Sequence, residues 1–176
     1  MTTTKWKFDP AHSEVQFRVR HLMISNVTGS FDKFTAAVET TDEKFETSHI
    51  TFSAEVASIT TKNEQRDGHL KSPEFFDVAK FPTISFVSTK FEKISDKEFT
   101  LSGDMTIHGV TKNIRLHVEH GGVILAHGNT RTGFNVEGKI NRRDFGLTWH
   151  SITEAGSVVL GDEVNIMACI QFIKQD

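Results

Sequence analysis

The sequence has little of several residues on which common classes of protein depend. Its 176 residues include 1 Cys, 3 Pro, 2 Trp and no Tyr. A single Cys excludes an internal disulfide framework, and we expect Cys169 to be a buried or half-buried structural thiol. Because Tyr is absent beside 15 Phe, the aromatic side chains carry almost no polar groups.

Neither sign of charge is in large excess. The 20 Lys and Arg against 23 Asp and Glu leave a net charge of -3. Nucleic-acid binding requires a basic patch, but the densest basic point is the pair Arg142 and Arg143, which Asp144 follows at once. No apolar run approaches the roughly 20 residues of a membrane-spanning helix. The composition thus predicts neither a nucleic-acid partner nor an integral membrane segment.

The chain gives no sign of division into parts. No internal repeat, low-complexity tract or shift in composition marks a boundary, so we expect residues 1–176 to form one domain. A chain of this length buries roughly 70% of its unfolded surface, which is enough for a core without a metal or disulfide. The segment Met1 to Trp6 lacks the features of a secretory signal, which predicts a cytoplasmic protein.

The hydrophobic pattern has a period of two residues, which is typical of strands with one buried face. The expected strands cover residues 14–20, 50–56, 99–107, 114–118, 134–140 and 164–172, together with the less regular stretches 29–39 and 83–92, which are rich in β-forming residues. Glycine-containing turns are expected at His108-Gly109, His120-Gly121-Gly122 and Gly128-Asn129. About eight strands joined by short turns predict an all-β fold, as an antiparallel sandwich or barrel.

Two segments interrupt this pattern. Residues 62–78 are polar without alternation, and we expect a short helical or loop insertion with Ser72 as an N-cap before Pro73. Residues 144–162 form a long irregular stretch, and loops of that length are often functional lids or rims.

Local motifs for metal binding or catalysis are missing. The 9 His include no His-x-His pair, and His117 and His120 should point to opposite faces of a strand. No Ser lies in a Gly-x-Ser-x-Gly turn, and no glycine-rich phosphate loop precedes a helix. We therefore predict no metal site and no catalytic nucleophile.

The densest polar cluster is Arg66-Asp67-Gly68-His69, within the expected insertion. One interpretation is that Arg66 and Asp67 hydrogen-bond to pin the insertion onto a barrel end. The other is that the cluster meets the polar end of a ligand or acts as an acid-base set.

The abundant Phe residues allow a similar choice between a filled core and a pocket wall. A barrel of about eight strands is just wide enough to fill with side chains or to enclose one slender ligand. Strands of 8 to 10 residues would make such a cavity roughly 25 to 30 Å long. Composition alone does not decide between these alternatives.

Motifs spread along the chain resemble those of a known family. They are Trp6 with Asp9-Pro10-Ala11-His12-Ser13, Val27-Thr28-Gly29-Ser30-Phe31, Arg66-Asp67-Gly68-His69-Leu70, Phe75-Phe76-Asp77-Val78, Phe81-Pro82, Thr106-Ile107-His108-Gly109, Arg143-Asp144-Phe145-Gly146 and Leu160-Gly161-Asp162. In this order they resemble the YceI-like family of polyisoprenoid-binding proteins. Two departures are the Phe81-Pro82 pair, where the family has Tyr-Pro, and the lack of the export signal that many relatives carry.

The resemblance implies a lipocalin-like, eight-stranded antiparallel barrel with an elongated apolar tunnel. It implies non-catalytic binding, transport or sequestration of a polyisoprenoid or quinone tail, with a fatty acid or amide as other candidate ligands. No metal and no cofactor besides the lipid are implied, and some members form a homodimer. Two rival hypotheses are an enzyme acting on a tunnel-bound lipid through His12, Arg66, Asp67 and His69, and a filled barrel that binds a partner protein.

The candidate site follows from the resemblance together with the inward-facing positions. The predicted tunnel-lining residues are Phe17, Val19, Phe31, Phe34, Phe52, Phe75, Phe76, Phe86, Met105, Phe134, Trp149 and Ile166. The predicted polar residues at the mouth, which would hold loops or meet a head group, are His12, Ser13, Arg66, Asp67 and His69.

Overall fold

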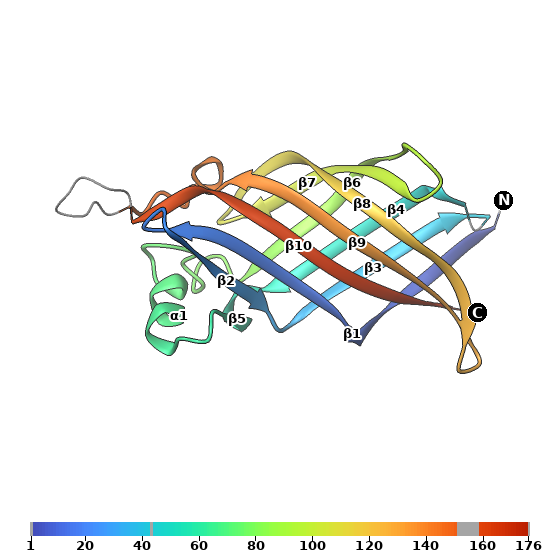
Figure 1. Cartoon of the computed structure of the whole chain (residues 1–176), viewed down its shortest axis with the longest axis horizontal. Helices are drawn as coiled ribbons and strands as arrows, with labels where there is room; N and C mark the ends of the chain where they lie inside the picture. Colours follow the sequence, from blue (N-terminus) through green and yellow to red (C-terminus); the bar gives the residue numbers. More distant parts are fainter. Residues whose placement is uncertain (1, 43, 151–158, 176) are drawn as a thin grey trace.

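Ten strands and one α-helix make up most of the chain in the computed structural model, which describes residues 2–42, 44–150 and 159–175 (Figure 1). The strands are β1 (Thr3–His21), β2 (Ser25–Phe31), β3 (Phe34–Thr41), β4 (Lys44–Glu55), β5 (Ile59–Thr60), β6 (Thr83–Lys93), β7 (Glu98–Ile107), β8 (Val110–Ala126), β9 (Asn129–Asn141) and β10 (Leu160–Lys174). The helix is α1 (Glu64–Lys71), and two short 3-10 helices are η1 (Val56–Ser58) and η2 (Arg142–Phe145). No described helix is long and apolar enough to cross a membrane.

Eight of these strands close into an antiparallel barrel. Their order is β1, β3, β4, β6, β7, β8, β9 and β10, and β10 then pairs with β1. The closing ladder is long, since it runs from the Trp6 and Lys174 pair to the His21 and Leu160 pair. The predicted eight-stranded antiparallel barrel is therefore confirmed, and closure leaves the inner face of every strand to the core.

The two strands outside this ring are β2 and β5, and β2 is separate from β3 because the expected strand 29–39 is interrupted at Asp32 and Lys33. Both β2 and β3 are antiparallel to β1, so they follow one another along it in the same direction (Figure 1). β2 pairs with β1 up to Ser30, and β3 resumes the pairing at Ala37. The expected strand 14–20 likewise starts earlier, at Thr3, and is irregular between Asp9 and Glu14.

The insertion contains the expected helix, but with a different start. Asn63 is the N-cap of α1, and its side-chain oxygen accepts a hydrogen bond from the Arg66 amide. The prediction that Ser72 is an N-cap is wrong, because Ser72 ends the helix as its C-cap. Its extended backbone has a physical cause, since the ring of the following Pro73 disfavours the helical conformation at the preceding residue.

Two of the three expected glycine turns are confirmed, at His108-Gly109 and at Gly128. The turn predicted at His120-Gly121-Gly122 is wrong, because these residues continue β8. The pairing with β9 shifts register between His120 and Val123, and Gly122 has a positive φ of 99°. Glycine here allows a bulge within a strand rather than a turn between two strands.

The expectation that the Cys169 thiol is buried or half-buried is also wrong, because Cys169 is exposed. It lies on the outer face of β10, whereas its neighbours Ala168 and Ile170 face inward. The predicted alternation along β10 is present, but a closed barrel without a second layer leaves its outer face exposed to solvent. Of the long irregular stretch 144–162, residues 151–158 lie outside the described residues and β10 begins at Leu160.

Candidate functional site

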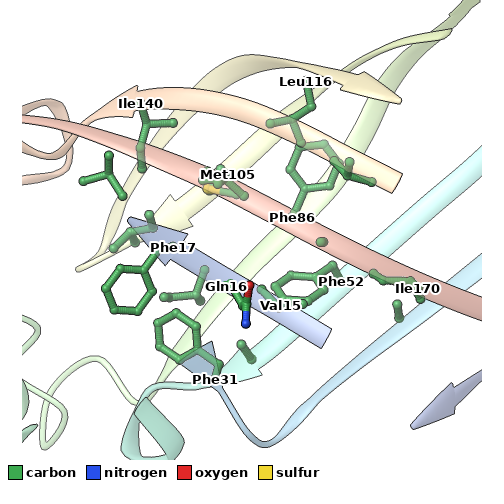
Figure 2. Close-up of a pocket in the computed structure, with 18 of the residues that line it drawn as sticks. Val15, Gln16, Phe17, Phe31, Phe52, Phe86, Met105, Leu116, Ile140 and Ile170 are labelled. Atoms are coloured by element: carbon green, nitrogen blue, oxygen red, sulfur yellow. The ribbon is translucent and has the colours of Figure 1, made fainter. Parts of the chain in front are cut away.

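An apolar cavity with a volume of about 210 Å³ runs inside the barrel. Of the described residues, 31 line it, 29 of which are apolar, and the two exceptions are Gln16 and Arg142. Figure 2 shows the rings of Phe17, Phe31, Phe52 and Phe86 around it. An interior with so few polar groups excludes water well and suits an apolar occupant.

The cavity is long because whole strands contribute to its wall. On β10 every second residue from Val164 to Phe172 lines it, which is the inward-facing set of the strand. Eight residue steps at about 3.3 Å each correspond to roughly 26 Å along the strand. This agrees with the length expected for a barrel of strands of 8 to 10 residues.

Two glycines make room for the aromatic rings of the wall. A Cβ added to Gly29 would lie 2.3 Å from the Phe17 ring, and one added to Gly103 would lie 2.2 Å from the Phe86 ring. Any larger residue at either position would have to displace a ring of the cavity wall. The glycines in β2 and β7 thus fix the positions of the rings on the neighbouring strands.

Ten of the twelve predicted tunnel residues line the cavity. They are Phe17, Val19, Phe31, Phe52, Phe75, Phe76, Phe86, Met105, Phe134 and Ile166. Phe34 does not, because it is the first residue of β3 and its ring packs beside Phe8, with centroids 5.1 Å apart. Trp149 does not line it either. Its ring packs on the rings of His69 and Phe75, and Leu147, two residues earlier, lines the cavity instead.

Most of the lining residues that were not predicted are aliphatic. They include Ile50, Ile84, Leu101, Ile107, Leu116, Val118, Val136 and Ile140. The period of two already marked these positions as inward-facing in the expected strands, so attention to aliphatic as well as aromatic residues would have found them. Arg142 gave no such signal, because adjacent arginines are usually solvated.

Aromatic rings fill the barrel end near the chain termini. The rings of Trp6 and Phe45 lie 5.3 Å apart, and Phe45 lies 5.6 Å from Phe134, which lines the cavity. The imidazole of His120 is part of the cluster, 4.8 Å from Phe134, and its Nε2 lies 2.7 Å from the Thr132 hydroxyl. These side chains form a floor on which the cavity ends.

Burial lowers the pKa of His120 below its ordinary value of 6.5. As the pH falls from 7 through 6.5, the imidazole of His120 is therefore protonated more readily in the unfolded chain than in the folded protein. Folding then becomes less favourable. We expect the free energy of unfolding to fall between pH 7 and pH 5 because of this residue. Urea denaturation at several pH values measures the change.

His120→Gln should remove this part of the pH dependence, while the same change at His127, exposed in the β8–β9 turn, should leave it in place. A pH dependence that is identical in the wild type and His120→Gln would contradict the assignment.

The opposite barrel end is covered by α1 and the chain that follows it, through Leu70, Phe75 and Phe76, together with Leu147. Arg142 braces this end. Its side chain is only 3% exposed, and it donates hydrogen bonds to the carbonyl oxygens of Gly161 (2.8 Å) and Leu147 (2.6 Å).

Arg142 also donates to the carbonyl oxygen of Trp149 at 2.7 Å, and the carboxylate of Asp162 lies 3.5 Å away. Burial lowers its pKa, while the charge of Asp162 acts in the opposite direction. Its N–H groups are hydrogen-bonded to backbone carbonyls, so Arg142 links the segment of Leu147 and Trp149 to the start of β10. Few of its donors are left for a polar group in the cavity.

Arg66 and Asp67 both hold Thr61. The carboxylate of Asp67 accepts hydrogen bonds from the Thr61 amide (2.8 Å) and hydroxyl (2.5 Å). The Arg66 guanidinium donates to the hydroxyl and the carbonyl oxygen of the same threonine, at 2.7 Å and 2.8 Å. These contacts pin α1 to the chain just after β5.

His69 contacts Glu74 and packs its ring against Phe75 and Trp149.

His12 and Ser13 lie elsewhere, in the irregular part of β1. The Asp9 carboxylate contacts the His12 imidazole and the Arg131 guanidinium, both at 2.8 Å, and Ser13 donates to the Asp9 carbonyl oxygen. The hydrogen bond from His12, and then that from Arg131, lowers the pKa of Asp9.

No contact among the described residues joins His12 to Arg66, Asp67 or His69. The four residues of the enzyme hypothesis therefore form two separate groups, each held by its own structural contacts. Nor do three described His, Cys, Asp or Glu side chains come together in a way that could hold a metal ion.

Comparisons with known proteins agree with this geometry. Residues 6–172 match the YceI-like domain. A UPF0312 protein of Staphylococcus aureus (strain MSSA476) is 41% identical over 171 residues, which cover 96% of this chain and 97% of the relative.

Among solved structures, the YceI protein of Campylobacter jejuni is 33% identical, with a TM-score of 0.78 over 89% of this chain and 90% of that one. BcnA of Burkholderia cenocepacia has a TM-score of 0.81 at 21% identity, covering 93% of this chain and 98% of that one. A polyisoprenoid binding domain of Saccharophagus degradans has a TM-score of 0.69 at 15% identity, covering 97% of this chain and 98% of that one. The last two similarities concern the fold.

Proposed function

The chain belongs to the YceI-like family, and from that premise we propose that it binds a long apolar lipid in its barrel cavity and does not change it chemically. The observation that carries the proposal is the cavity wall, in which 29 of the 31 described lining residues are apolar. The polyisoprenoid binding domain of Saccharophagus degradans, which shares the fold, supports an isoprenoid as the ligand class.

The energetics favour a polyisoprenoid or a quinone tail. Each isoprene unit has five carbons, and at about 0.8 kcal/mol per buried CH₂ it contributes on the order of 4 kcal/mol before the costs of association. Several units in a narrow cavity of this length would outweigh the contribution of a polar head. The absence of Tyr fits the same role, because an unpaired hydroxyl in an apolar wall would cost about 1 to 3 kcal/mol.

The contacts of the polar residues support a binding role without catalysis. Arg66 and Asp67 both form hydrogen bonds with Thr61, and the His12 imidazole forms one with the Asp9 carboxylate. A general acid or base has to reach the bound substrate within hydrogen-bond distance. These side chains instead hold the chain segments that surround the cavity.

A test is to purify the protein under native conditions, extract it with organic solvent and identify the extract by mass spectrometry. The extracted protein is then titrated with geranylgeraniol. We expect an isoprenoid in the extract, or uptake of about one geranylgeraniol per chain, recovered unchanged. Recovery of no lipid together with no uptake would refute lipid binding. A product formed by the wild type, but not by Asp67→Ala or His69→Ala, would refute the non-catalytic role in favour of the enzyme hypothesis.

A further inference from the structure

The barrel wall has a notch where β1 separates from β2 and β3. The ladder stops at the Gln16 and Ser30 pair and resumes at the Lys7 and Ala37 pair, so residues 8–15 of β1 have no partner on this side. A hollow of about 590 Å³ occupies the gap. It shares Val15, Gln16 and Phe31 with the apolar cavity, so the two spaces adjoin.

The edges of the notch are held by specific contacts. On one edge, Arg131 and His12 bind the Asp9 carboxylate, and the Ser13 hydroxyl accepts a hydrogen bond from the Gln171 amide. On the other edge, the Lys33 amide donates to the Ser58 hydroxyl at 3.0 Å. The same residues that resemble the N-terminal family motif thus keep β1 away from the strand beside it.

Both ends of the barrel are covered by described side chains. The aromatic cluster of Trp6, Phe45, His120 and Phe134 fills one end, and Phe75 and Phe76 cover the other. Helix α1 lies at this second end (Figure 1). At the notch no strand pairing closes the wall: Phe8 and Phe34 pack across it with ring centroids 5.1 Å apart, and Val15, Gln16 and Phe31 line both the hollow and the cavity.

The charges around the notch are mostly negative. Glu14, Asp32 and Glu55 line it, and Lys33 is the one cation among its lining residues. All four side chains belong to exposed residues. Three carboxylates against one ammonium repel an anion and tolerate a neutral or cationic group.

We propose that this notch is the entrance to the cavity and that it holds the head of the lipid, which carries no negative charge. The inference rests on the proposed lipid binding and adds to it the route and the class of head group. An alcohol or other uncharged head then binds in preference to a phosphate.

The first experiment compares geranylgeraniol with geranylgeranyl phosphate, which differ only in the head. At low salt the wild type should bind the alcohol about tenfold more tightly, a preference that salt weakens. The triple variant Glu14→Lys, Asp32→Lys and Glu55→Lys should abolish or reverse the preference. The triple variant Glu39→Lys, Glu119→Lys and Glu137→Lys changes the net charge equally, with exposed residues outside the notch, and should retain it.

An alcohol-to-phosphate ratio that is the same in all three proteins would overturn the head-group assignment.

The second experiment tests the route. Thr35→Cys lies at the exposed rim of the notch, and Thr111→Cys is exposed on β8, in the opposite part of the wall. Each is made in a Cys169→Ser background and coupled to a maleimide carrying a 2 kDa polyethylene glycol. The rate of geranylgeraniol uptake is followed by stopped-flow fluorescence.

We expect coupling at residue 35 to slow uptake about tenfold and coupling at residue 111 to leave the rate unchanged. Equal rates in the two coupled proteins, with intact binding at equilibrium, would overturn the entrance but leave the proposed function standing. Failure of the uncoupled protein to bind at all would instead refute the proposed function.

Discussion

Replacing Arg142 by Met is expected to lower the free energy of unfolding by about 3 to 5 kcal/mol. The guanidinium is 3% exposed and donates to the carbonyl oxygens of Leu147, Trp149 and Gly161. Methionine fills a similar volume but leaves these acceptors without a donor, and each unpaired group costs about 1 to 3 kcal/mol. Since domains are stable by only about 5 to 15 kcal/mol, the loss should be plain in urea denaturation curves.

Arg143→Met provides the matched control. Arg143 is adjacent and also contacts Asp162, at 2.7 Å, but its side chain is 38% exposed. An exposed ion pair contributes about 0 to 1 kcal/mol, so this variant should remain close to the wild type. Equal losses in the two variants would show that the contact with Asp162, rather than the carbonyl hydrogen bonds, carries the stability.

Replacing Ala36 by Phe is expected to weaken geranylgeraniol binding about a hundredfold, or roughly 2.7 kcal/mol. Ala36 lines the cavity, so the added ring should occupy space that the lipid chain would otherwise fill. Displacing even one isoprene unit removes on the order of 4 kcal/mol of burial before compensation. Because the ring enters an existing cavity, the thermal unfolding temperature should remain near that of the wild type or rise. Fluorescence titration and calorimetry measure the two quantities.

Ala37→Phe is the matched control for this prediction. Ala37 is the next residue of β3 and is exposed on the outer face of the barrel. The same substitution there adds the same surface without entering the cavity, so affinity should be unchanged. Comparable losses of affinity in both variants would indicate a general disturbance of β3 and would argue against the cavity as the binding site.

The barrel itself could be predicted from the sequence because its signal is repeated. The period of two recurs in strand after strand, for example from Val164 to Phe172, and a single misread residue does not change the conclusion. Eight of the ten predicted positions that line the cavity lie in strands and follow the same alternation, while Phe75 and Phe76 lie after α1. Phe34 alternates in step with the inward-facing Ala36 and Val38, but it is the first residue of β3. The hydrophobic pattern predicts which face of the strand a side chain lies on, but not how far along the barrel it lies.

Interruptions of the strands were harder to predict. Gly121-Gly122 has the composition of a turn, yet it forms a bulge in β8, because pairing with β9 continues on both sides of it. Ser72-Pro73 has the residue types of a helix start, but the helix begins at Asn63 and Ser72 ends it. In each case the local residues permit two structures, and pairing partners distant in the sequence decide between them.

The scarcity of polar aromatic residues, the balanced charge and the alternating strands were enough to determine an all-β domain with an apolar interior. Whether that interior is filled or hollow depends on how far apart the strands hold their side chains, which closure of β10 onto β1 decides. Tertiary structure also gave Arg142 its role, because carbonyl groups up to 19 residues away converge on it. It placed His12 and Arg66 in separate groups and opened the notch between β1 and the strand beside it. These features depend on contacts between distant residues, which a local pattern does not contain.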